Sequence, residues 1–406
     1  MNSKLTYIDL FAGCGGLSLG LHNSGWKGLF AIEKSPDAFK TLEHNLIKKK
    51  KHFNWPKWLP QSNHDINEVL YNYSEELKSL KEKVDLVAGG PPCQGFSIAG
   101  QRNEKDNRNK LINSYVEFID LVKPKLIFFE NVKGFTMEFK GNKKKGVRYS
   151  EIVTKKLINS GYNVYGELVN FGEYGVPQKR TRFILIGIRK DVENSSTKKA
   201  KSFFKILEQS KFSFFKQKNI PDKPTIQDAI SDLIGNNVSV ETPDRPKYKS
   251  RLYGKKESKY QEYVRRYVRD NKIPDSHSFA KHSQNVINRL KYIQKVTNEC
   301  KNISIDLKNK LGIKKQVLIP LQAGNQCPTI TSHPDDLIHY KEPRILTVRE
   351  YARIQSFPDW FEFKGKYTTG GKLRKVEVPR YTQIGNAIPP LFGEQAGLIL
   401  KNMLYE

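Results

Sequence analysis

The stretch Val84-Asp85-Leu86-Val87-Ala88-Gly89-Gly90-Pro91-Pro92-Cys93-Gln94 determines how this chain is interpreted. Its apolar part, Val84–Ala88, has the length and composition of a buried strand, and it is followed by two glycines, two prolines and a cysteine. Prolines stiffen the backbone, and glycines let other groups approach it closely. Because open α/β sheets bind ligands at the carboxyl ends of parallel strands, we expect the thiol of Cys93 at a position suited to a nucleophile.

Strands and helices alternate through the first half of the chain. The expected strands are Leu5–Phe11, Gly28–Glu33, Val84–Ala88, Lys125–Val132 and Phe183–Ile188. The expected helices are marked by Leu111, Tyr115, Phe118 and Val122, which recur on one helical face, and by Ile152–Leu157, with an end near Gly161. This alternation predicts an α/β fold, in which a mostly parallel sheet has helices on both faces.

The composition indicates a partner with many negative charges. The 406 residues include 70 Lys and Arg against 42 Asp and Glu, a formal net charge of +28. An excess of this size is expected of a protein that neutralises the phosphates of a nucleic acid. After about residue 190 the chain becomes rich in Lys, Asn, Ser and Tyr, with shorter apolar runs, which indicates a second domain that extends to about residue 340.

The cysteines do not form a structural framework. The four are Cys14, Cys93, Cys300 and Cys327, and no two have Cys-x-x-Cys spacing. We therefore expect neither a disulfide framework nor a metal site. The sequence also has no apolar signal region at its start and no run of about 18 apolar residues. We expect a cytoplasmic protein without a membrane partner, in a reducing compartment that keeps Cys93 free.

A glycine-rich loop between the first expected strand and the first expected helix is a candidate cofactor site. Its residues are Phe11, Ala12, Gly13, Cys14, Gly15, Gly16 and Leu17. Glu33, with Lys34 beside it, follows Gly13 by 20 residues, and a carboxylate at that offset can accept hydrogen bonds from ribose hydroxyls. Ser18 breaks the Gly-x-Gly-x-x-Gly pattern, which favours a nucleoside cofactor without a pyrophosphate. Asp65 and Ile66 are candidates for holding its adenine.

Six short motifs occur in order along nearly the whole chain. They are Phe11–Gly16, Pro91–Gln94, Phe129-Glu130-Asn131-Val132, Gln178-Lys179-Arg180-Thr181-Arg182, Arg344–Pro358 and Gln383–Pro389. In sequence and order they resemble the motifs of the cytosine-carbon-5 DNA methyltransferase family, prokaryotic type. The resemblance implies a Rossmann-like, S-adenosyl-L-methionine-dependent methyltransferase domain and a smaller, variable DNA target-recognition domain. The implied division is 1–190 for the catalytic domain, 191–340 for target recognition, 341–380 for a hinge with the ninth motif, and 381–406 for a return to the catalytic domain.

The resemblance implies covalent catalysis by Cys93. Carbon 5 of cytosine is a poor nucleophile, and a thiolate that adds to carbon 6 makes it reactive. Glu130, at the end of a buried strand, can supply a proton at ring nitrogen 3 if its surroundings raise its pKa. Arg180 and Arg182 alternate on an expected strand, so both can point into one site beside the base or a phosphate. Asn131 would orient the loop or the base.

Further residues are implied to contact the cofactor and the DNA. Pro91 and Asn386 would lie beside S-adenosyl-L-methionine. The target atom is inaccessible in a stacked duplex, so the cytosine must be swung out. The polar loop after Cys93 would close over the DNA, and Gln101, Arg102 and Arg108 are its candidate contacts. Arg344, Arg349 and Arg353 would brace a domain junction.

The expected function is therefore methyl transfer to carbon 5 of cytosine in double-stranded DNA. The enzyme would act as a monomer in a prokaryotic cytoplasm, at the nucleoid. It would serve either in a restriction–modification system beside a companion restriction endonuclease or as an orphan modification enzyme. Two alternatives stay open: a tRNA cytosine-5 methyltransferase, although its usual Cys-Phe-Thr is absent at all four cysteines, and a catalytically dead DNA-binding relative. The sequence does not reveal the DNA target.

Overall fold

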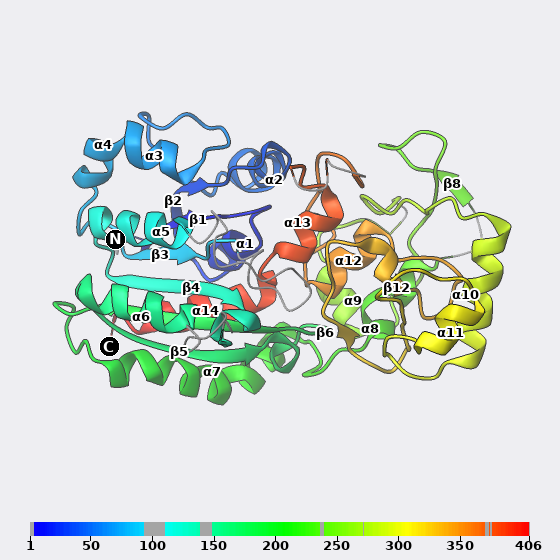
Figure 1. The fold of residues 1–406 in the computed structure, drawn as a ribbon. Coiled ribbons are helices and arrows are strands. Elements are labelled where there is room, and N and C mark those ends of the chain that lie inside the picture. The colour runs from blue at the N-terminus through cyan, green and yellow to red at the C-terminus, as the bar shows by residue number, and fades with distance from the viewer. Residues whose placement is uncertain are drawn as a thin grey trace. The chain divides into compact units, whose positions relative to one another are not determined.

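The computed structural model describes residues 4–92, 110–138, 148–235, 239–270, 272–369, 373 and 376–405 (Figure 1). The chain forms two compact units. Unit 1 comprises Met1–Asn170, Thr181–Lys211 and Gly393–Glu406, and unit 2 comprises Phe171–Arg180 and Phe212–Phe392. Both late motifs, Arg344–Pro358 and Gln383–Pro389, belong to unit 2. The division into four functional segments stays a prediction, because compactness does not assign a function to a segment.

Unit 1 is built on one six-stranded sheet. Its strands are β1 (Thr6–Leu10), β2 (Lys27–Ile32), β3 (Leu86–Gly89), β4 (Leu126–Val132), β5 (Tyr162–Asn170) and β7 (Thr181–Arg189). Their order is β2-β1-β3-β4-β7-β5, in which the first four are parallel and β7 runs antiparallel to both of its neighbours. The structure thus confirms the α/β fold and the five expected strands, and it adds β5 at the sheet edge.

Helices cover both faces of this sheet. Those in or entering unit 1 are α1 (Gly16–Asn23), α2 (Pro36–Leu42), a π-helix (Glu43–Lys49), α3 (Ile66–Asn72), α4 (Ser74–Ser79), α5 (Lys110–Val122), α6 (Tyr149–Asn159), α7 (Thr197–Lys218) and α14 (Pro390–Asn402). On one face, the apolar side chains of α3, α5 and α6 share a core with Ile8, Val87 and Ile127 of the strands. On the other face, α1 contacts β1, where the Tyr7 hydroxyl donates to Ser18 O at 3.4 Å.

Glycines let α1 and α14 cross at close range. A Cβ placed on Gly20 would lie 2.5 Å from the carbonyl carbon of Gly393 and 2.6 Å from Glu394 N. The indole of Trp26, just beyond α1, donates to Gly397 O at 2.8 Å. The carboxyl-terminal helix is therefore held against the first helix by backbone proximity that only a residue without a side chain allows.

Unit 2 consists of short elements. Its strands are β6 (Gln178–Lys179), β8 (Ser239–Glu241), β9 (Lys249–Arg251), β10 (Ile319–Pro320), β11 (Cys327–Pro328) and β12 (Leu337–Ile338). Its helices are α8 (Ile226–Ile230), α9 (Lys259–Val264), α10 (Gln284–Val296), α11 (Ile305–Lys310), α12 (Val348–Ile354) and α13 (Arg380–Asn386). These strands pair only in twos, so little of the cohesion of unit 2 comes from an extended sheet.

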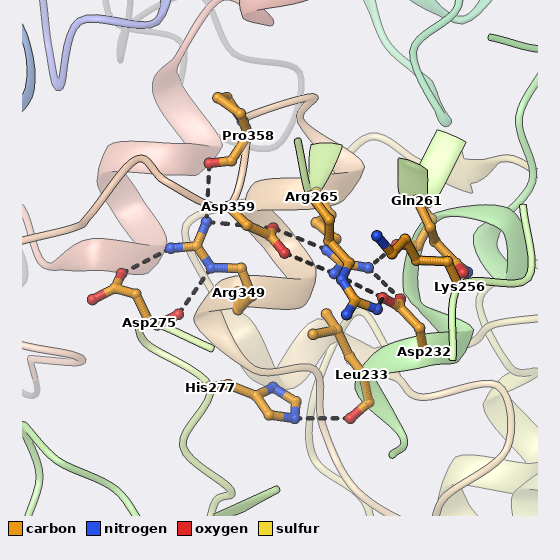
Figure 2. Close-up of polar contacts among 12 residues, drawn as sticks. Asp232, Leu233, Lys256, Gln261, Arg265, Asp275, His277, Arg349, Pro358 and Asp359 are labelled. Atoms are coloured by element: carbon orange, nitrogen blue, oxygen red, sulfur yellow. Dashed lines mark hydrogen bonds and ion pairs between the residues drawn. The ribbon is translucent and has the colours of Figure 1, made fainter. Parts of the chain in front are cut away.

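Buried ion pairs connect the segments of unit 2 (Figure 2). Arg353 of α12 contacts Asp359 at 2.7 Å and Asp232 at 3.0 Å, and all three side chains are fully buried. Arg349 contacts Asp275 at 2.8 Å, and Arg344 is paired with Glu350 at 2.7 Å. Removing one member of a buried pair typically costs about 3–5 kcal/mol, against about 0–1 kcal/mol for a surface pair. Arg353 and Arg349 therefore hold distant segments of unit 2 together, whereas Arg344 braces the start of α12 locally.

Within the described part of the chain, no helix has the length and apolar character needed to cross a membrane.

We predict that Gly20→Ala destabilises the protein. Alanine improves helix propensity by about 1 kcal/mol, but overpacking against the α14 backbone costs about 1–3 kcal/mol or more. The net effect should be a lower thermal midpoint, measured by circular dichroism. The control is Gly324→Ala, because a Cβ there would meet nothing within 4 Å. A Gly20→Ala midpoint equal to or above that of the wild type would contradict the close crossing.

Candidate active site

The glycine-rich loop leaves β1 through an unusual backbone path. Phe11, Gly13 and Gly15 have φ values of 57°, 56° and 90°, and Ala12 N donates to Ile32 O of the neighbouring strand at 3.0 Å. A Cβ on Gly15 would lie 2.9 Å from Leu46 Cδ1, whereas one on Gly13 would meet nothing within 4 Å. Gly15 is thus required for packing, and Gly13 borders open space. The rest of the loop, Cys14, Gly16 and Leu17, is buried.

Glu33 holds this loop from the end of β2. Its Oε2 accepts the Gly13 N–H at 2.9 Å, and its Oε1 accepts the Ser35 N–H at 2.7 Å. Burial raises the pKa of Glu33, and the backbone donors at Ser35 and Gly13 act in the opposite direction. These two bonds place the Glu33 carboxylate at the glycine loop, and its expected role as an acceptor for ribose hydroxyls stays a prediction.

The other expected cofactor residues of unit 1 lie near Glu33. The Lys34 ammonium pairs with Asp65 Oδ2 at 2.8 Å, and His64 N donates to Glu33 O at 2.9 Å. Asp65 also caps α3, since its Oδ1 accepts the Asn67 N–H at 2.8 Å. The side chain of Ile66 is 3% exposed and packs in the hydrophobic core.

A buried carboxyl group beneath the loop was not singled out from the sequence. Asp9 of β1 is 1% exposed and accepts the Ser18 hydroxyl of α1 at 2.5 Å. Burial raises the pKa of Asp9 to about 7, and the charge of Glu33 adds to the effect. The sequence contains one indication of this group, because Asp9 interrupts the otherwise apolar stretch Tyr7-Ile8-Asp9-Leu10. A carboxylate is rarely buried without a partner.

The end of β3 is enclosed by its two neighbouring strands. Gly89 has φ 128°, and a Cβ there would lie 1.9 Å from Leu10 O of β1. A Cβ on Gly90 would lie 1.8 Å from Glu130 O of β4. Both residues must therefore be glycine, and the chain that continues into Pro91 leaves the sheet between the glycine loop and Glu130.

Asn131 attaches this exit to β4. Its side chain is 2% exposed. Its Nδ2 donates to Pro91 O at 3.3 Å, while its Oδ1 accepts the Val132 N–H at 2.8 Å. Of the two roles expected for Asn131, these bonds match the one of orienting the loop. Cys93, Gln101, Arg102 and Arg108 lie outside the described residues.

Glu130 and Arg182 form an ion pair on one face of the sheet. In the antiparallel register Glu130 faces Ile184 and Val132 faces Arg182, so Glu130 and Arg182 are diagonal neighbours within reach of each other. Arg182 Nε lies 3.1 Å from Glu130 Oε1, and the two side chains are 13% and 15% exposed. The pair is thus placed at the carboxyl end of β4, beside the Gly90 backbone.

Arg180 departs from the sequence prediction. It lies between β6 and β7 instead of sharing a strand with Arg182, and it belongs to unit 2, whereas Arg182 belongs to unit 1. Its side chain is 2% exposed and donates to Gly385 O at 2.7 Å and to Ile330 O at 3.4 Å. The predicted alternation was wrong because the chain leaves one short strand and enters a longer one at this residue. Asn386, also in unit 2, is the exposed last residue of α13.

No cluster of three or more His, Cys, Asp or Glu side chains that could hold a metal ion occurs among the described residues.

The fold is that of an α/β methyltransferase, and comparison with known proteins specifies the class. A profile of the family described as C-5 cytosine-specific DNA methylase matches residues 5–401. The chain belongs to this family, and it is a DNA cytosine-5 methyltransferase.

Individual relatives match over most of their lengths. The type II methyltransferase M.DdeI of Desulfomicrobium norvegicum is 32% identical, over 96% of this chain and 87% of that protein. The type II methyltransferase M.XorII of Xanthomonas oryzae is 30% identical, over 96% and 83%. A solved E. coli structure, assigned as a DNA modification methyltransferase encoded within a prophage, has a TM-score of 0.64 and 25% identity, over 99% of this chain and 100% of that one.

We predict that Asn131→Asp slows methyl transfer while the protein stays folded. The aspartate cannot donate to Pro91 O, and its charge would repel that carbonyl oxygen. Leaving a buried acceptor such as Pro91 O unpaired costs about 1–3 kcal/mol. If this cost falls on the transition state, through a misplaced backbone at the exit from β3, the methylation rate should fall by roughly 5–150-fold. Asn302→Asp is the control, because exposed Asn302 likewise donates to a carbonyl, Gln316 O, at 2.9 Å. Wild-type rates for Asn131→Asp would show that this bond does not position the loop.

Proposed function

We propose that this enzyme transfers the methyl group of S-adenosyl-L-methionine to carbon 5 of a flipped-out cytosine in a specific duplex DNA sequence, through a covalent adduct with Cys93. The observation that carries the proposal is the arrangement at the ends of β3 and β4. There the Pro91 exit from β3 is bonded to Asn131 of β4, and Glu130, the residue before Asn131, is paired with Arg182 of β7.

The residues around the glycine loop fit a nucleoside cofactor. Gly13 borders open space, so a ligand can lie against the backbone there. The Glu33 carboxylate already accepts N–H groups and can accept ribose hydroxyls, and Asp65 is held nearby by Lys34. The remaining loop residues would shape the site, and Pro91, at the exit of β3, and Asn386 are further candidate contacts to the cofactor. When bound, S-adenosyl-L-methionine supplies an electrophilic methyl group on a sulfonium.

Cys93 supplies the nucleophile. Its thiol loses a proton, the thiolate adds to carbon 6, and the electron pair displaced from the 5,6 double bond makes carbon 5 nucleophilic. Carbon 5 then takes the methyl group. Loss of the carbon 5 proton and cleavage of the S–C6 bond restore the aromatic ring and the thiolate. Cys14 is no competitor for this role, because burial raises its thiol pKa well above the usual value.

Glu130 stabilises the adduct by holding a proton at ring nitrogen 3 of the cytosine. Arg182 fixes the orientation of the Glu130 carboxyl group through the 3.1 Å contact. It can also meet the base or the adjoining phosphate. Arg180 donates to backbone carbonyls of unit 2, so we assign it no contact with the base and only a role as a positioning residue.

The DNA partner is supported by the family and by the net charge of +28. Gln101, Arg102 and Arg108 would contact the duplex beside the extruded base. The names of M.DdeI and M.XorII, both type II methyltransferases, support a role in a restriction–modification system with a companion endonuclease. We further propose a monomer at the nucleoid in a prokaryotic cytoplasm.

Cys93→Ala should abolish methyl transfer and leave DNA binding intact. The wild type should form a stable covalent complex with duplex DNA that carries 5-fluorocytosine, because the fluorine at carbon 5 cannot leave as a proton does. Methylation mapping of genomic DNA from cells that express each form gives the target sequence in the same experiment. Methylation by Cys93→Ala, or a wild type that traps no adduct, would refute the covalent route.

Glu130→Gln should reduce the methylation rate by about 10²–10⁴-fold, the range for general acid–base groups. The amide keeps the size of the side chain, so binding of DNA and cofactor should change much less. Glu151→Gln is the control, since exposed Glu151 also faces an arginine, Arg148, at 3.4 Å. A Glu130→Gln rate close to that of the control would remove Glu130 from the mechanism.

A further inference from the structure

The turn that follows α9 presents an aromatic side chain in a strained conformation. Tyr267 has φ 72°, in the left-handed region that bulky residues rarely adopt. Its side chain is nevertheless 84% exposed, so it gains little from burial in exchange for this strain. Strain of this kind persists where the surroundings enforce it, and it concentrates at functional positions.

The surroundings enforce the turn at both ends. Arg265, which is 1% exposed, donates to Asp232 Oδ2 and to Gly254 O, each at 2.8 Å. The same guanidinium binds Asp270 on the far side of the turn, and Lys256 lies 3.4 Å from that carboxylate. Figure 2 shows the Arg265 side chain directed toward Asp232. The segment Arg266–Arg269, which we call the Tyr267 turn, is therefore presented on a rigid base.

Two arginines belong to the same turn as the exposed ring, Arg266 before Tyr267 and Arg269 two residues after it. The guanidinium of Arg266 lies 4.3 Å from the centroid of Tyr263 and 5.9 Å from that of Tyr267. Among the described residues, no carboxylate lies within ion-pair distance of either Arg266 or Arg269. The Tyr267 turn thus combines an exposed aromatic face with two positive charges that no carboxylate neutralises.

We propose that the Tyr267 turn contacts the DNA duplex, with Arg266 and Arg269 on phosphates and the Tyr267 ring against a sugar or a base. The proposal rests on the DNA substrate of the proposed function and adds a contact from unit 2. Phosphates attract unpaired guanidinium groups, and the flat face of an aromatic ring packs against nucleotides. A protein partner fits less well, because it would have to supply an aromatic-binding surface and separate anions for Arg266 and Arg269, whereas a nucleotide carries both features.

The first test replaces Tyr267 by Gly. Glycine adopts the left-handed region without steric cost, so the thermal midpoint should stay equal or rise. The dissociation constant for a fluorescent duplex that carries the mapped target site should rise by about 5- to 100-fold, as expected for a lost aromatic contact. S-adenosyl-L-methionine binding should not change. Tyr71→Ala is the control, because Tyr71 is 87% exposed on α3 of unit 1.

The second test separates the charges from the ring. Arg269→Gln should lower the slope of log affinity against log salt by about one, whereas Tyr267→Gly should leave that slope unchanged. Wild-type affinity in both variants would overturn the contact, even if the enzyme methylates DNA normally. A wild type that methylates no DNA would instead overturn the proposed function.

Discussion

The candidate active site depends on two backbone oxygens that occupy the space where side chains would otherwise stand. Leu10 O and Glu130 O would lie 1.9 and 1.8 Å from Cβ atoms on Gly89 and Gly90. Contacts this short leave no room for adjustment, so the glycine pair sets where the chain leaves β3. The exit then lies between the glycine loop, which follows Leu10, and the Glu130 carboxyl group. The sheet register thereby brings together the glycine loop, the exit from β3 and the Glu130 carboxyl group.

Two further bonds convert this proximity into defined orientations. Asn131 connects β4 to Pro91 O, and Glu33 connects β2 to Gly13 N. Both side chains act on backbone groups, so each holds a loop instead of another side chain. Asp9 performs a related task through Ser18, at the start of α1. The parallel part of the sheet thus provides three polar side chains, Glu33 after β2, Asn131 near the end of β4 and Asp9 within β1. Each of them binds a residue in a segment that follows a strand. In the proposed function, the chemistry therefore depends on the glycine loop and on the exit from β3, which the sheet holds in place.

The first four strands, α1, α5 and α6 were predictable because their apolar patterns are separated by glycine and proline, whereas the short helices between β2 and β3 were missed. The strand β5 was missed, since only Tyr162, Val164 and Val169 of its nine residues are buried and an edge strand has a weaker pattern. The spacing between Gly13 and Glu33 indicated a carboxylate for the same site as the glycine loop, but their direct hydrogen bond was not predicted. The Arg180 position was not, because a change of strand at one residue leaves no trace in composition. The partners of the unit 2 arginines were also inaccessible, since Arg353 and Asp232 are 121 residues apart.

The arginines of unit 2 perform two different tasks, and burial separates them. Arg353 and Arg265 are 0% and 1% exposed, and each is engaged by two carboxylates. Such clusters contribute no net positive charge, because carboxylates compensate the guanidinium groups. The excess of +28 must therefore reside in cationic side chains outside these clusters. Arg266 and Arg269, in the same turn as the strained and exposed Tyr267, are cations of this second kind. Neighbouring positions in one short segment thus divide into a structural arginine that faces inward and arginines that are free to meet phosphates.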